Sequence, residues 1–309
     1  LLVSRCLRTA ARAGALSGER PPVLMDVDDK DDAVIEYRLR EQNLDPVSRL
    51  LLRERKRQLS RLFKLLSAKA SHLWLTAAED CAEIDHPSKS VLPNIPYKSP
   101  PADAPPAPPP NTSTLLFVGT AQHGPNARGV ARFISQSWPH VLDRAPEARL
   151  RIVGRGGWKR MDATSSVALG VDFVGDVDDI SAEYAKADLV ICPIFEGGGS
   201  KIKVLEALAH GRTVVASRHS ARGYDRELAD GAIVIADDDK ELADRCVDLL
   251  QNPARARALA ECGRRIVNER YNRRRFAEIV VADCERALEA RIAQSGGRGG
   301  WARRAAAFF

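Results

Sequence analysis

The chain of 309 residues is long enough for two domains of ordinary size. Its hydrophobic content of 44% and charged content of 28% are typical of a globular protein. The sequence contains no run of about 18 apolar residues, so no membrane-spanning helix is predicted. The net charge of +6 admits nucleic acid, an anionic membrane surface or a phosphorylated substrate as a partner. The basic residues do not interleave with the few Trp and Tyr, which argues against nucleic acid.

Six widely spaced cysteines form no CxxC pair and no Cys/His cluster, so neither a zinc site nor a disulfide framework is predicted. We expect free thiols in a reducing cytoplasm. The chain begins with Leu1, and its first 22 residues contain a single acid, Glu19. We interpret this stretch as the helix tail of a domain whose beginning is missing; a transit peptide is the alternative.

The N-terminal part alternates short apolar runs with helical ones, which is typical of a parallel sheet covered by helices. A strand is predicted at 23–27. Asp26, Asp28 and Asp29 would then lie at its carboxyl end, where open parallel sheets bind their ligands. A long helical stretch broken near Pro46 follows, and further strands are predicted within 72–80 and at 90–94.

A proline-rich stretch separates this part from the rest of the chain. Residues 95–111 read IPYKSPPADAPPAPPPN, which has no hydrophobic period and favours extended backbone, so they predict a linker. The predicted organisation is therefore an incomplete N-terminal domain, a linker, a C-terminal domain and a terminal helix with a tail, at 1–94, 95–112, 113–270 and 271–309.

After the linker the alternation of strands and helices is regular. Strands are predicted at 113–118, 149–153, 171–174, 189–192, 213–216 and 232–235. Helices are predicted between them at 125–142, 181–186 and 200–210, and three more helical stretches close the chain. The pattern predicts an α/β fold with a doubly wound parallel sheet.

The segment EGGGSKIKVLEALAHG, which follows the apolar strand at 189–192, is the best candidate for a binding site. Gly197, Gly198 and Gly199, followed by Ser200, would let backbone N–H groups approach an anion at the start of a helix. Lys201 and Lys203 are catalytic candidates that add positive charge there. The combination suits a diphosphate.

Glu206 is the third catalytic candidate in this helix. It shares a face with Lys203 by helical spacing, opposite an apolar face that packs on the sheet, and its carboxylate can accept bonds from the two hydroxyls of a ribose. The alternative is a glycine-rich turn followed by an exposed helix with a weak surface ion pair. We expect His123 to be a surface-turn residue and His210 a solvated one. The acids at 237–239 predict a helix start and no metal site.

These segments resemble the glycosyltransferases of family 4 in the GT-B fold. The resemblance covers FVGTAQHGPNARGVARF, LRIVGRG, the long block from residue 171 to 217 that contains EGGGSKIK, and the ending LLQNPARARALAECGRRIVNERYN. VLMDVDD and VLPN are similar to the last parts of the family's N-terminal domain. The resemblance implies two Rossmann-like doubly wound domains, the first of them incomplete here, with the active site between them.

The resemblance also implies roles for matching positions. Glu206 is similar to the second of two family glutamates, the one that holds the nucleotide ribose. The turn at 197–200 resembles the cradle of the sugar diphosphate, while Gly119, Gly154 and Gly175 would line the donor site. The first family glutamate, which touches the donor sugar, is replaced by Gly198. Glu196 would substitute for it only if the loop follows another path.

The implied activity is transfer of a sugar from a UDP- or GDP-sugar to a glycan, lipid or small-molecule acceptor, with retention of configuration and without a metal or other cofactor. Such enzymes build bacterial polysaccharides and glycoconjugates, so we expect a cytoplasmic protein, with peripheral contact at the inner membrane face as an option. A non-catalytic nucleotide-sugar-binding remnant and a sugar-nucleotide epimerase stay open as alternatives. Because the first domain is incomplete, we expect the chain to bind donor without turnover.

Overall fold

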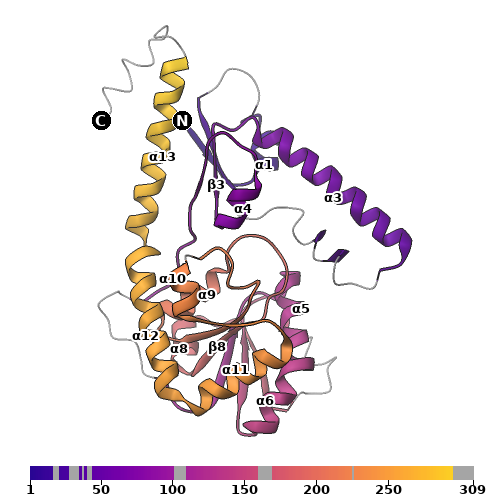
Figure 1. Ribbon diagram of the computed structural model, residues 1–309, viewed down its shortest axis with the longest axis vertical. Helices are drawn as coiled ribbons and strands as arrows, with labels where there is room; N and C mark the ends of the chain where they lie inside the picture. The colour runs from indigo at the N-terminus through magenta and orange to yellow at the C-terminus, as the bar shows by residue number, and fades with distance from the viewer. Residues whose placement is uncertain are drawn as a thin grey trace. The chain divides into compact units, whose positions relative to one another are not determined.

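The computed structural model describes residues 1–16, 21–27, 35–36, 38–39, 44–100, 109–158, 169–224 and 226–294. The predicted Asp28 and Asp29, and residues 101–108 of the proline-rich segment, lie outside these ranges. The chain divides into two compact units (Figure 1). Unit 1 contains Leu1–Pro93 and the chain from Arg273 onward, and unit 2 contains Asn94–Asn272.

Unit 1 is built on a four-stranded parallel sheet in the order β1-β2-β3-β4. Its strands are β1 (Leu2–Ser4), β2 (Val23–Val27), β3 (His72–Leu75) and β4 (Lys89–Val91). Its helices are α1 (Leu7–Arg12), α3 (Pro46–Ser67), α4 (Ala78–Glu83) and α13 (Arg273–Gln294). The interpretation of the first residues as a helix tail is wrong for β1. Three residues are too few to show a strand period, yet Leu2 pairs with Val23 at the edge of the sheet.

A buried carboxylate ties α13 to this sheet. Asp283 accepts hydrogen bonds from Trp74 Nε1 and from Ser90 Oγ, both at 2.7 Å, and it pairs with Arg286 on its own helix. Phe276 and Ile279 of α13 pack on Leu24 and Trp74. The terminal helix, which the sequence treated as a separate segment, is therefore grouped with the N-terminal residues because its buried contacts are there.

Unit 2 is a six-stranded, entirely parallel sheet in the order β10-β9-β8-β5-β6-β7, with helices on both faces (Figure 1). The strands are β5 (Thr114–Val118), β6 (Arg149–Val153), β7 (Val171–Gly175), β8 (Leu189–Cys192), β9 (Thr213–Ser217) and β10 (Ile233–Ala236). They match the six predicted strands to within a residue at each end. The inner strands β5, β8 and β9 are largely apolar on both faces because both faces are covered, as parallel sheets require.

The helices of unit 2 are α5 (Gly124–Arg132), the π-helical turn η1 (Phe133–Ser137), α6 (Trp138–Arg144), α8 (Ile180–Ala185), α9 (Ile202–Ala209), α10 (Arg226–Gly231), α11 (Asp239–Gln251) and α12 (Pro253–Arg270). The single helix predicted at 125–142 is thus interrupted by a π turn. The π turn comes just before Pro139, which has no N–H to donate to a regular helix. No helix in the described part of the chain is long and apolar enough to cross a membrane.

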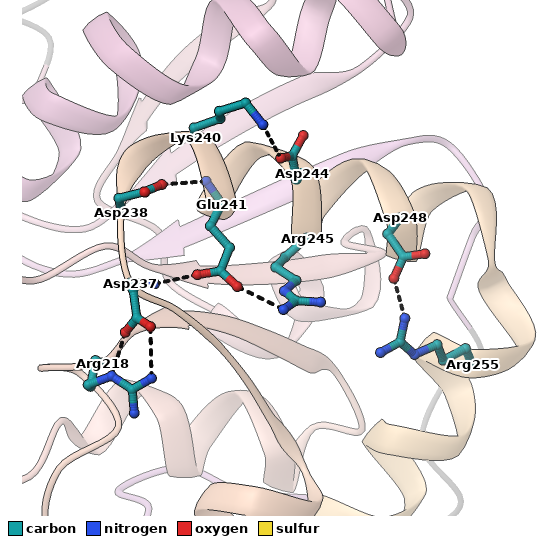
Figure 2. Close-up of polar contacts among 9 residues, drawn as sticks. All are labelled: Arg218, Asp237, Asp238, Lys240, Glu241, Asp244, Arg245, Asp248 and Arg255. Atoms are coloured by element: carbon teal, nitrogen blue, oxygen red, sulfur yellow. Dashed lines mark hydrogen bonds and ion pairs between the residues drawn. The ribbon is translucent and has the colours of Figure 1, made fainter.

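The acids at the start of α11 cap the helix, as predicted. Asp238 Oδ1 accepts a bond from the backbone N–H of Glu241 at 2.7 Å, and Glu241 Oε2 accepts one from the N–H of Asp237 at 2.8 Å (Figure 2). Asp237 also pairs with Arg218. The carboxylates are therefore engaged with the helix and with arginine, and the described residues hold no group of acids, histidines and cysteines fit for a metal ion.

Candidate functional site

The strand order of unit 2 reverses between β5 and β8. From β5 the chain moves outward to β6 and β7, and it then returns to the other side of β5 to form β8, β9 and β10. In open α/β sheets the loops that leave two such strands diverge, and ligands bind in the crevice between them. The loop after β5 begins at Gly119, and the loop after β8 contains the three glycines.

Three glycines predicted to line the donor site allow the neighbouring loops to approach closely. A Cβ on Gly154, whose φ is +135°, would lie 2.2 Å from the carbonyl oxygen of Gly119. That oxygen accepts a bond from Trp158 Nε1 at 2.8 Å. Gly175, with φ +84°, accepts a bond from Gly154 N–H at 2.7 Å. The three predicted glycines are therefore brought together at one edge of the sheet.

The glycine-rich loop after β8 is buried and adopts backbone that favours glycine. Gly197 and Gly199 have φ of +98° and +61°, respectively. The carbonyl of Gly198 accepts a bond from Lys201 Nζ at 2.6 Å. Tyr224 Oη donates to the backbone carbonyl of Lys201 at 2.6 Å. The loop thus folds back on Lys201, the residue directly before α9, and its glycine carbonyls contact the ammonium group of that lysine.

Lys203 carries the second ammonium group, and it is held at the crevice by neutral partners. Its Nζ donates to Asn126 Oδ1 at 2.6 Å and lies 4.4 Å from the centre of the Phe117 ring. Asn126 Nδ2 in turn donates to the carbonyl of Thr120 at 2.9 Å. Burial lowers the pKa of Lys203 from 10.5 to about 8, and within the described residues it forms no ion pair with a carboxylate. A Cβ on Gly119 would lie 2.9 Å from this Nζ, so the glycine leaves room for it.

Asn126 is a site residue that sequence reasoning missed. It lies near the start of the first helix of unit 2, 77 residues before Lys203 in the sequence. It is nearly buried, although an asparagine in the first turn of a helix is ordinarily exposed. Only its neighbour Pro125, which fits the first turn of a helix, indicated that this turn is well defined.

Glu206 lies one turn further along α9. Burial raises the pKa of its carboxyl, while the backbone amides of Lys98 and Tyr97 act in the opposite direction. Those amides belong to the segment at the start of unit 2, where Asn94 Nδ2 also donates to Ser200 Oγ at 3.0 Å. The predicted ribose ligand therefore lies beside main chain from the linker region.

His210 differs from the prediction of a solvated residue. It is 7% exposed, stacks on the Tyr184 ring at 4.4 Å between ring centres, and is hydrogen-bonded to the carbonyl of Lys98 at 3.2 Å. The ring is buried because α9 ends against α8 and the linker segment. His123 is exposed, as expected for a surface turn.

Glu196 is buried and paired with Arg128 of α5. Oε2 of the glutamate and Nη2 of the arginine are both buried, and neither has a hydrogen-bond partner among the described residues. His219, whose pKa burial lowers to about 4, lies against the backbone of Glu196 and Gly197. The carboxylate is therefore held under the loop by an arginine, two residues before Gly198.

Unit 1 contains its own cavity, of about 400 Å³. It lies at the carboxyl ends of β1 and β2 and is lined by Arg5, Arg8 and Asp26, and by apolar side chains of α3 such as Leu59 and Phe63. Asp26, the one member of the predicted acidic group that the structure describes, therefore lines a cavity and lies 3.7 Å from Arg5.

Comparison with known proteins agrees with the architecture. Residues 112–252 match the family model "Glycosyl transferases group 1". A phosphatidyl-myo-inositol mannosyltransferase of Mycobacterium leprae is 30% identical over 60% of the chain and 48% of the relative. A GDP-mannose-dependent phosphatidylinositol monomannoside mannosyltransferase of Corynebacterium glutamicum is 30% identical over 44% of the chain and 39% of the relative. The chain thus spans about half the length of the curated relatives it matches, or less.

Two solved structures have the same fold at low identity. Sucrose-phosphate synthase from Thermosynechococcus elongatus superposes with a TM-score of 0.62 at 18% identity, covering 93% of the chain and 73% of the synthase. Anabaena HepE, solved in complex with UDP, superposes with a TM-score of 0.56 at 16% identity, covering 94% of the chain and 79% of HepE. The chain is therefore similar to the glycosyl transferases group 1 over residues 112–252, and its two α/β units have the fold of these glycosyltransferase structures.

Proposed function

We propose that the crevice at the ends of β5 and β8 binds the diphosphate of a nucleotide-sugar and that the chain takes part in transfer of the sugar. The observation that carries this proposal is Lys203. A buried ammonium group without a paired carboxylate costs folding free energy unless a ligand uses it. Lys201 lies on the adjoining glycine-rich loop. Two ammonium groups beside the start of α9 suit two phosphates.

The proposed chemistry is electrostatic. As the bond between sugar and diphosphate breaks, negative charge grows on the leaving phosphate, and fixed ammonium groups stabilise that charge. We propose that Lys201 and Lys203 supply this stabilisation and that the reaction requires no metal. The resemblance to family 4 supports retention of the anomeric configuration, with the leaving diphosphate assisting the incoming hydroxyl.

We propose that Glu206 binds the ribose hydroxyls. Its carboxylate faces the amides of Tyr97 and Lys98, and one carboxylate has enough lone pairs for both these amides and a sugar diol. Glu196 is in a different situation, because Arg128 already neutralises it. We propose that Glu196 holds the glycine-rich loop in place beneath the donor sugar. Its Oε2 atom, which has no partner among the described residues, would accept a hydrogen bond from a sugar hydroxyl.

The acceptor is assigned to unit 1. Its cavity combines an apolar floor with Arg5, Arg8 and Asp26 at the ends of β1 and β2. Such a lining fits a molecule with an apolar part and a polar or anionic head, and the relatives named above are mannosyltransferases of phosphatidylinositol lipids. We accordingly propose a lipid-linked acceptor and a peripheral position at the inner face of the membrane.

The test is to titrate the 309-residue chain with a panel of UDP- and GDP-sugars and to assay each for release of nucleoside diphosphate, with and without phosphatidylinositol vesicles. Saturable binding with release or transfer supports a transferase. Saturable binding without turnover supports the nucleotide-sugar-binding alternative. If no nucleotide-sugar binds, the proposed function is wrong.

A further inference from the structure

The helix α3 of unit 1 has an unusual distribution of charge and apolar surface. Its 22 residues, PVSRLLLRERKRQLSRLFKLLS, contain seven basic side chains and one acid. Asp45 caps its start by accepting bonds from the N–H groups of Val47 and Ser48, both at 3.0 Å, so the helix is well defined from its first turn. Of its residues only Ser67 is fully buried.

One side of α3 is committed to unit 1. Leu59, Phe63 and Leu66 lie within about a quarter turn of one another and line the cavity described above. The apolar residues on another side have no such cover. Each is about two-thirds exposed, and they are Val47, Leu50, Leu51 and Leu65. These four form an exposed apolar stripe.

A basic row flanks this stripe. Arg53, Arg57 and Arg61 follow one another at intervals of four residues, and Lys64 comes three later, so all four lie on one side of the helix. Arg57 pairs at 3.8 Å with Glu54, the single acid, while Arg53 and Arg61 pair with nothing among the described residues. Like charges at this spacing repel one another and destabilise an isolated helix, and an anionic partner would offset this repulsion.

We propose that α3 is a docking surface for an anionic phospholipid membrane, with the exposed apolar stripe inserted among the acyl chains and the basic row at the level of the headgroups. An exposed apolar stripe beside a basic row is the arrangement of helices that lie in the plane of a membrane interface. Charge complementarity selects the anionic lipid. A nucleic acid would use the basic row alone and leave the leucines exposed to water.

The experiment is co-sedimentation of the 309-residue chain with vesicles of phosphatidylcholine alone, or mixed two to one with phosphatidylglycerol. We expect binding to the mixed vesicles only, weakened by high salt. Each basic residue at such a surface contributes about fivefold to partitioning, so Arg53→Gln with Arg61→Gln should weaken binding about 30-fold. Leu51→Gln with Leu65→Gln should weaken it by at least about tenfold, and glutamine preserves the helix.

A matched control is Arg257→Gln with Arg291→Gln. Both arginines lie in helices outside α3, and in the described structure neither has an ion-pair partner. This pair removes the same charge and should bind vesicles like the unchanged chain. Equal losses from both arginine pairs would mean that only net charge matters and would overturn the proposal.

Three other results would also overturn it. They are equal binding to both vesicle types, binding to a single-stranded RNA that Leu51→Gln with Leu65→Gln leaves intact, and a dimer that this leucine pair dissociates while vesicle binding is unchanged. The last would assign the stripe to a second copy of the chain. Circular dichroism of each variant checks that α3 remains folded.

Discussion

Replacing Lys203 with methionine should separate ligand binding from stability. The ammonium group donates to Asn126 Oδ1 at 2.6 Å and has no carboxylate partner in the described structure. If it also holds the diphosphate, the variant loses one charged hydrogen bond and a nearby charge, which together amount to about 2–4 kcal/mol or 30- to 1000-fold in affinity. The uncharged nucleoside should lose far less.

The same substitution should leave the fold as stable as before or more so. The pKa of Lys203 lies at about 8 instead of 10.5, so at neutral pH the folded chain carries an ammonium group that costs about 3 kcal/mol to keep charged. Methionine removes that cost. It leaves Asn126 Oδ1 without its donor, which costs about 1–3 kcal/mol. The net change in the free energy of unfolding is therefore between zero and about +2 kcal/mol.

The assay is calorimetric titration of UDP, GDP and the parent nucleosides into both proteins, with denaturant unfolding of each. Lys240→Met, on an exposed lysine of α11 paired with Asp244, is the matched control and should bind like the unchanged chain. Equal losses for nucleoside and diphosphate would refute the phosphate role of Lys203. A large loss of stability would refute the argument that its charge is a cost to the fold.

Four further predictions concern the same region. Glu206→Ala should weaken nucleotide-sugar binding by about 2–4 kcal/mol, measured by calorimetry, and unchanged affinity would exclude the ribose role. Asn126→Ala should weaken diphosphate binding through Lys203, and nucleoside binding measured alongside should stay constant. Because the pKa of Lys203 is lowered, its ammonium form predominates below about pH 8, so diphosphate affinity should fall above that pH, and Lys203→Met should remove this dependence. Gly154→Ala should lower the free energy of unfolding by at least about 2 kcal/mol, whereas Gly231→Ala, with open space around its Cβ, should not.

The inner strands of unit 2 could be predicted because each is a short, largely apolar run between turn residues, and burial on both faces leaves little polar alternation in them. The glycine-rich loop was recognisable for a similar local reason: Gly197 and Gly199 adopt positive φ in a loop directly after a buried strand. β1 was missed because the three residues Leu2–Ser4 form a strand only by pairing with Val23–Val27.

Contacts between residues far apart in the chain could not be predicted from the sequence. Asn126 meets Lys203 across 77 residues, and Asp283 meets Trp74 across 209. Neither pair has a local signal, because an asparagine or an aspartate on a helix is ordinarily solvated. His210 is a similar case, because the linker segment that covers it comes from more than a hundred residues earlier in the chain.

The donor site is tested most directly by hydrogen exchange of the chain with and without a saturating nucleoside diphosphate. We predict slower exchange in the loop at 196–203 and in the turn at 119–123, with little change in α11 and α12. The loop at 196–203 contains both lysines and the glycines expected to approach the phosphates, and Gly119 of the turn lies against Lys203 Nζ. Protection confined to other segments, with these two unchanged, would contradict the assignment of the donor site.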